Sequence, residues 1–103
     1  MATTVVYIYG QSGVGKTKLL RDVFDGCTHG LVRRGNLTLF LWDDAQLVTF
    51  SHDTVPRVDW FIVCSNKTPD DVPIHLDHIF CIDSAENLKE ARLFLSSIWG
   101  SDN

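Results

Sequence analysis

The sequence predicts a single α/β domain built on a mainly parallel, five-stranded sheet, and three observations lead to that prediction. Apolar runs rich in β-branched residues recur along the chain, segments with helical spacing follow some of them, and polar residues gather directly behind several runs. The 103 residues are 45% hydrophobic and 21% charged, which is typical of one globular domain. We therefore expect one domain spanning residues 1–103.

The strands are predicted from runs of β-prone residues that turn signals interrupt. Four runs are apolar throughout, as in strands buried on both faces of a parallel sheet. A fifth, HGLVRRG, predicts a short and more exposed strand that ends at glycine. In chain order the predicted strands cover 4–9, 29–35, 36–42, 59–66 and 78–83.

Two helices are predicted from apolar residues at helical spacing. The first follows a glycine-rich loop in KTKLLRDVF, residues 16–24. Ser84 opens the second, in which Leu88, Ala91, Leu95 and Ile98 share one face. The polar segment 45–58 is expected to form a short helix before a loop or hairpin, and KTPDD (67–71) a turn.

Charge and cysteine content limit the class of protein. The net charge of −4 disfavours a broad nucleic-acid-binding face. Cys27, Cys64 and Cys81 are odd in number and the last two lie in apolar runs, so we expect buried thiols in a reducing compartment. Neither a signal peptide nor eighteen consecutive apolar residues are found, which predicts an intracellular protein without a membrane segment.

The clearest motif is GQSGVGKT, which fits the pattern G-x-x-x-x-G-K-[ST] between a predicted strand and a predicted helix. Glycines let backbone N–H groups turn inward around a polyphosphate, to which the helix N-terminus adds positive potential. Lys16 would reach the β- and γ-phosphates and Thr17 would ligate Mg²⁺. The predicted phosphate-binding residues are Gly10, Gln11, Ser12, Gly13, Val14, Gly15, Lys16 and Thr17. The alternative is a glycine turn with a solvated lysine.

Polar residues follow two later strands, where a nucleoside triphosphatase places its acids. Asp43 and Asp44 end one buried strand, and we predict Asp43 as a metal ligand and Asp44 as the base that activates water. Asn66 ends the next strand and would hydrogen-bond the γ-phosphate or the attacking water. The alternatives are a solvated turn or helix cap for the acids, and a turn-forming asparagine.

With GQSGVGKT, LFLWDDAQ and FIVCSNKTP in this order, the chain resembles the superfamily 3 helicases of small DNA and RNA viruses. DD followed by AQ is similar to motif B of the picornavirus-type helicases, and SN followed by TP to motif C of the circovirus-type replication proteins. The resemblance covers roughly residues 4–83. It implies the three-layer sandwich of P-loop NTPases, here a minimal AAA+-like core.

The resemblance also implies partners. Family members form rings, usually hexamers, that bind ATP and Mg²⁺ between subunits and move along single-stranded nucleic acid. Their pore loop lies between motifs B and C, where this chain offers His52 and Arg57. An exposed histidine and a loop arginine without a ligand are the alternative. The family's arginine finger commonly follows motif C, and this segment contains no arginine.

Three functions remain open from the sequence. The first is a helicase-type ATPase, in which Lys16, Asp44 and Asn66 are catalytic, acting in viral replication or packaging. The second is a nucleotide-dependent assembly or binding module with little turnover. The third, a small-molecule or nucleoside kinase, is disfavoured because the nine basic residues form no lid-like cluster.

Overall fold

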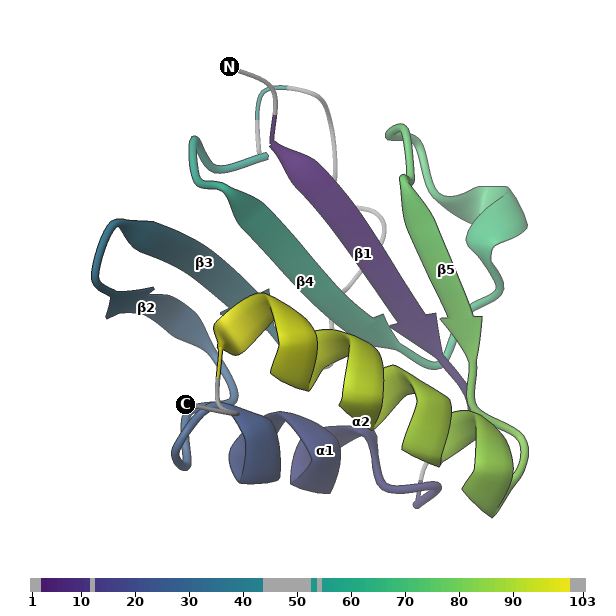
Figure 1. Ribbon diagram of the computed structural model, residues 1–103. Helices are drawn as coiled ribbons and strands as arrows, with labels where there is room; N and C mark the ends of the chain where they lie inside the picture. The colour runs from purple at the N-terminus through teal and green to yellow at the C-terminus, as the bar shows by residue number, and fades with distance from the viewer. Residues whose placement is uncertain (1–2, 12, 44–52, 54, 101–103) are drawn as a thin grey trace.

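The structure is a computed structural model that describes residues 3–11, 13–43, 53 and 55–100. Five strands form one sheet in the order β2-β3-β4-β1-β5 (Figure 1). Their bounds are β1 Thr4–Tyr9, β2 Gly30–Arg34, β3 Leu37–Trp42, β4 Trp60–Ser65 and β5 His78–Cys81. All pairings are parallel except that of β2 with β3. The predicted five-stranded, mainly parallel α/β sheet is confirmed.

Strand β1 lies in the interior of the sheet, between β4 and β5, and is buried on both faces as its unbroken apolar sequence predicts. Val6 and Ile8 belong to the core on one face, whereas Val5 and Tyr7 belong to the core on the other. Because the strand is fixed from both sides, the loop that follows Tyr9 starts from a rigid position.

Both α-helices, α1 (Lys16–Val23) and α2 (Ala85–Trp99), lie on the same face of the sheet (Figure 1). Leu19 and Leu20 of α1 and Ala91 and Leu95 of α2 are completely buried in the core of that face. The sequence predicted a three-layer sandwich. Within the described residues the sheet carries α-helices on one face only, so the third layer is not confirmed.

The opposite face is covered by extended segments of the chain. The connection from β4 to β5 contains a 3₁₀ turn, Pro69–Asp71, at the predicted KTPDD turn, and its Ile74 packs on Val5 and Tyr7. Val55 and Val58 pack there too. Most of segment 45–58, for which a short helix was predicted, lies outside the described residues.

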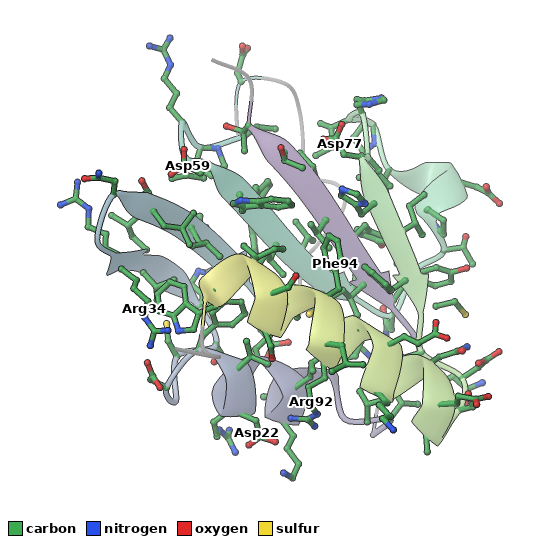
Figure 2. All side chains as sticks on the ribbon, viewed as in Figure 1. Asp22, Arg34, Asp59, Asp77, Arg92 and Phe94 are labelled. Carbon is green, nitrogen blue, oxygen red and sulfur yellow. The ribbon has the colours of Figure 1, made fainter. Side chains whose placement is uncertain are left out.

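Two carboxylates lie at the amino-terminal ends of the strands, and Figure 2 shows Asp59 beside the start of β4 and Asp77 beside the start of β5. Asp59 accepts hydrogen bonds from the backbone N–H and the hydroxyl of Thr38, at 2.8 and 3.2 Å. Asp77 accepts one from the Val5 N–H at 2.8 Å and lies 3.2 Å from the His75 Nε2 atom. These acids satisfy strand-end donors that would otherwise lack partners.

The β2–β3 hairpin is the part of the sheet that the sequence predicted least specifically. Gly35, at φ +61°, occupies the first position of a two-residue turn, where a positive φ favours glycine. Arg34 then fastens the hairpin to the end of α2: its guanidinium lies 4.6 Å from the centre of the Trp99 ring and donates to the Trp99 carbonyl at 3.0 Å.

All three cysteines are free thiols, as expected, but only one is fully buried. Cys64 faces the helices and is buried, Cys27 is half-buried, and Cys81 is exposed. The prediction of a buried Cys81 is wrong because β5 lies at the edge of the sheet, where one side of the strand meets solvent. Neither α-helix of the described chain has the length and apolar character that crossing a bilayer requires.

Candidate phosphate-binding site

The loop between β1 and α1 has the backbone conformation that its glycines permit. Gly13 and Gly15 adopt φ values of +88° and +106°, which residues with a Cβ rarely tolerate. Gly10 is required for a different reason. A Cβ at Gly10 would lie 2.6 Å from the backbone oxygen of Ile82, so the loop packs directly on the chain that leaves β5.

Lys16 is folded into this loop. Its side chain is only 7% exposed, and its ammonium donates to the carbonyls of Gly10 at 2.7 Å and Gln11 at 2.9 Å. No carboxylate forms an ion pair with it among the described residues. Burying an unpaired charge is costly, and neutral carbonyls compensate for that cost less well than an anion does.

The two helices differ at their amino-terminal ends. At α2 the Ser84 hydroxyl accepts from the Asn87 N–H, and Glu86 lies in the first turn. At α1 the cap residue is Gly15, which has no side chain to accept a hydrogen bond, and no acid lies in the first turn. The start of α1 therefore has neither a side-chain cap nor an acid of its own first turn, and it faces the same loop as the ammonium of Lys16.

Thr17 and Asp43 are adjacent in space. The Thr17 hydroxyl, in the first turn of α1, donates to Oδ2 of Asp43 at 2.8 Å. Asp43 directly follows β3, which is separated from β1 by β4. A hydroxyl beside a carboxylate matches the oxygen ligands that Mg²⁺ takes, and Mg²⁺ commonly binds one or two carboxylates together with substrate phosphates. Within the described residues, no group of three or more His, Cys, Asp or Glu side chains forms a metal site by itself.

The end of β4 lies beside the start of the loop. The Gly10 N–H donates to the Ser65 carbonyl at 3.3 Å, which places Asn66, the next residue, at the same edge. Asn66 is exposed. The turn after it is held by the Tyr7 hydroxyl, which donates to the Lys67 carbonyl at 2.8 Å, and by the buried Ser65 hydroxyl, which accepts from the Lys67 N–H.

The remaining predicted site residues divide into two groups. Ser12, Asp44 and His52 lie outside the described residues, so their roles stay predictions. Arg57 is described and exposed, and it lies two residues before Asp59, at the amino-terminal edge of the sheet. The predicted phosphate loop (residues 10–17) is at the carboxyl-terminal edge. The structure therefore does not bring Arg57 to the phosphate loop of the same chain.

Three of the hollows on the described surface bear on the predicted site residues. The two larger ones, of about 550 and 410 Å³, are both lined by Arg57 and open at the amino-terminal edge of the sheet. A third hollow, of about 280 Å³, adjoins the phosphate loop. It is lined by Val14 of the loop and by residues of the β5–α2 turn and α2, namely Ile82, Asp83, Ser84, Ala85 and Leu88.

Acidic groups surround the end of β1 on its β5 side. The pKa of the Tyr9 hydroxyl is raised above its ordinary value of 10.0, first by a hydrogen bond with the side chain of Cys81 and then by desolvation. The charges of Asp70 and Asp83 raise the pKa further.

Sequence reasoning predicted the loop, Lys16, Thr17 and Asp43 as site residues, and their roles stay predictions. It missed the contacts that support the loop. The close approach of Gly10 to Ile82 and the hollow beside Val14 both depend on β5 lying next to β1. These residues are about seventy positions apart, and no local pattern signals such a contact. The hydrogen bond from Tyr7 to the turn after β4 was not predicted, because a tyrosine in an apolar run is also explained by burial of its ring in the core.

Comparisons of the chain with protein-family models, with curated proteins and with solved structures found no match.

Proposed function

We propose that this protein binds and hydrolyses a nucleoside triphosphate together with Mg²⁺. The observation that carries the proposal is the buried ammonium of Lys16, held by loop carbonyls at an uncapped helix N-terminus. Among the described residues no carboxylate forms an ion pair with this ammonium. A bound polyphosphate would supply the missing negative charge.

The residues of the site suit the charge changes of phosphoryl transfer. Loop N–H groups and Lys16 would hold the β- and γ-phosphates, exchanging the carbonyl contacts of Lys16 for phosphate oxygens. Thr17 and Asp43 would hold the metal ion, which supplies further neutralisation of the phosphate oxygens when bound. In this proposal Asp44 accepts a proton from the attacking water and Asn66 orients that water. Catalysis consists of positioning and electrostatic stabilisation.

Two lysines of α1 provide a matched pair for the test. Lys16 is buried in the loop, whereas Lys18, two residues later, is 72% exposed and pairs with Asp22 at 2.8 Å. We expect Lys16→Ala to weaken Mg-ATP binding by at least about tenfold, the loss of one charge-assisted contact, and to abolish turnover. Lys18→Ala should leave both unchanged. Binding is measured by titration calorimetry and turnover by phosphate release.

Equal affinities for the two variants, with both folded by circular dichroism, would contradict the proposal. A further variant, Asp44→Asn, separates binding from hydrolysis. Loss of turnover with retained Mg-ATP affinity is expected if Asp44 acts on the water.

The position of the arginines bears on assembly. Arginines often stabilise the transition state of such reactions, and here all of them are described. Arg33 and Arg34 in β2, and Arg57 before β4, lie toward the amino-terminal edge of the sheet. Arg21 lies in the last turn of α1, and Arg92 of α2 pairs with Asp22. A second copy of the chain would have to supply one.

The proposal therefore includes a ring or other homo-oligomer that completes the site, as the helicase resemblance implies. Turnover measured over a series of protein concentrations, with and without single-stranded DNA or RNA, tests it. A specific activity that rises with protein concentration supports a shared site, and stimulation by nucleic acid supports a helicase-type motor. ATP-dependent oligomers without turnover would favour the nucleotide-dependent assembly module instead.

A further inference from the structure

The hollow beside the phosphate loop has the position and the lining of a site for a planar ring. It measures about 280 Å³, at the lower end of the size of ligand pockets, so it suits one part of a ligand. Val14 belongs to the phosphate loop itself. A ligand whose phosphates occupy the loop can therefore place its other end in the hollow without leaving the protein surface.

Most of the lining of the hollow is apolar, and Asp83 supplies its charged group. Val14, Ile82 and Leu88 supply aliphatic surface, and Val14 and Leu88 pack against the core of the helix-bearing face. Gly15 lies next to this wall, because a Cβ there would be 3.5 Å from Cδ2 of Leu88, an ordinary contact distance. Burial of a flat aromatic ring against these side chains is favourable.

Asp83 is the charged residue of the lining. Its Oδ1 accepts from Nδ2 of Asn87 at 2.5 Å, which orients the carboxylate. An ionised carboxylate only accepts hydrogen bonds, and its two oxygens offer about four acceptor positions. The bond from Asn87 therefore leaves acceptor positions on Asp83 free for a ligand that donates hydrogen bonds.

We propose that this hollow binds the base of the nucleoside triphosphate, and that Asp83 makes guanine the preferred base. This inference rests on the proposed function. The Watson–Crick edge of guanine presents two adjacent donors, the ring N–H and the amino group, which match the two oxygens of a carboxylate. Adenine presents one donor beside a ring nitrogen that carries a lone pair, and that lone pair is repelled by the carboxylate. The helicase resemblance implied ATP, and this inference differs from it.

Three ligands and four proteins test the inference, each with Mg²⁺ present and affinity measured by calorimetry. The ligands are GTP, ATP and inorganic tripolyphosphate, which carries the phosphates without a base. Ala85→Trp fills the hollow, and Ser97→Trp is its control, because Ser97 is an exposed small residue near the other end of α2. Asp83→Asn removes the charge and keeps the size of the side chain.

The wild-type protein should bind GTP at least about tenfold more tightly than ATP, the value of one good charge-assisted hydrogen bond. Ala85→Trp should weaken GTP by at least about tenfold, the loss expected when an apolar base site is filled, and leave tripolyphosphate unchanged. Ser97→Trp should change neither. Asp83→Asn should bring the GTP and ATP affinities together.

Three results would overturn the inference while leaving the proposed function intact. If Ala85→Trp binds GTP like the wild type, the base does not occupy the hollow. If the wild type binds ATP as tightly as GTP, or Asp83→Asn keeps the wild-type ratio, Asp83 does not select the base. Failure of the wild type to bind tripolyphosphate and GTP would overturn the proposed function, and this inference with it.

Discussion

The Thr17 hydroxyl donates a 2.8 Å hydrogen bond to Oδ2 of Asp43 and so joins the start of α1 to the end of β3. Strand β4 lies between β1, which leads into α1, and β3. The contact thus spans roughly 10 Å of sheet, two steps of about 4.8 Å. Thr17 and Asp43 are 26 residues apart in the sequence, and this contact brings together the two side chains that the sequence predicted as oxygen ligands of a metal ion.

The first prediction follows from this pair. Thr17→Val keeps the shape of the side chain and removes the hydroxyl, so the affinity for Mg-ATP should fall toward that for ATP without metal. Asp43→Asn should act in the same direction. The measurement is ATP affinity by calorimetry over a range of Mg²⁺ concentrations.

Thr17→Ser is the control for this prediction, because it restores the hydroxyl. It should respond to Mg²⁺ as the wild type does. A Thr17→Val protein whose ATP affinity rises with Mg²⁺ like that of the wild type would exclude Thr17 as a metal ligand.

The second prediction concerns Gly10. An alanine there would place its Cβ 2.6 Å from the Ile82 oxygen, a backbone atom that cannot swing aside. We expect Gly10→Ala to lower the free energy of unfolding by about 1–3 kcal/mol, the usual cost of overpacking. Urea denaturation followed by tryptophan fluorescence measures the change.

Gly13→Ala is the comparison for Gly10. No atom lies within 4 Å of a Cβ at Gly13, so its cost comes only from the positive φ and should be about 1–2 kcal/mol. A Gly10→Ala protein with the stability of the wild type would show that the loop does not pack on β5 as described.

The third prediction is a pH dependence at the contact between the helices, which Figure 2 shows on their outer side. Asp22 accepts hydrogen bonds from Lys18 at 2.8 Å and from Arg92 at 3.1 Å. These bonds, that of Lys18 first, hold the pKa of Asp22 below its ordinary value of 3.8. The stabilisation that the ionised Asp22 gives the folded protein is therefore complete above pH 3.8. It is lost as the pH falls through the lowered pKa of Asp22.

Asp22→Asn should accordingly reduce the free energy of unfolding at neutral pH, and its difference from the wild type should shrink in acid below 3.8. Urea denaturation at several pH values measures both. Glu90→Gln is the control, since Glu90 is exposed and has no ion pair among the described residues. A pH-independent difference for Asp22→Asn would contradict the assignment.

The fourth prediction concerns single-stranded nucleic acid. Arg57 is exposed and lines both large hollows of the amino-terminal edge, so it can meet a phosphate backbone there. If it does, Arg57→Ala should weaken binding of single-stranded oligonucleotides and reduce the slope of log affinity against log salt by about 1. Fluorescence anisotropy at several salt concentrations measures the slope.

Arg21→Ala is the control for Arg57, because Arg21 lies in the last turn of α1 on the helix-bearing face. Its slope should equal that of the wild type. Equal slopes for Arg57→Ala and the wild type would remove Arg57 from the proposed interface. The same experiment with His52→Ala tests the second predicted nucleic-acid residue.

Much of the fold could be predicted because its signals are local. The strand Thr4–Tyr9 and the helix opened by Ser84 were expected from apolar runs, helical spacing and a capping serine, and all lie within a few residues of the elements they specify. The third layer was implied by resemblance alone, and the described residues do not contain it. Cys81 was misjudged because an apolar run does not tell whether its strand lies inside the sheet or at an edge.

The sequence by itself determined the conformation of the glycine-rich loop after β1, since glycines at 13 and 15 and the lysine at 16 act through neighbouring backbone. It also indicated which residue types could hold a metal ion. Only the tertiary structure decided that Thr17 meets Asp43, that Gly10 packs on Ile82 and that a hollow opens beside Val14. Those contacts depend on the order of strands in the sheet, which is set by the packing of distant segments and leaves no pattern in any one of them.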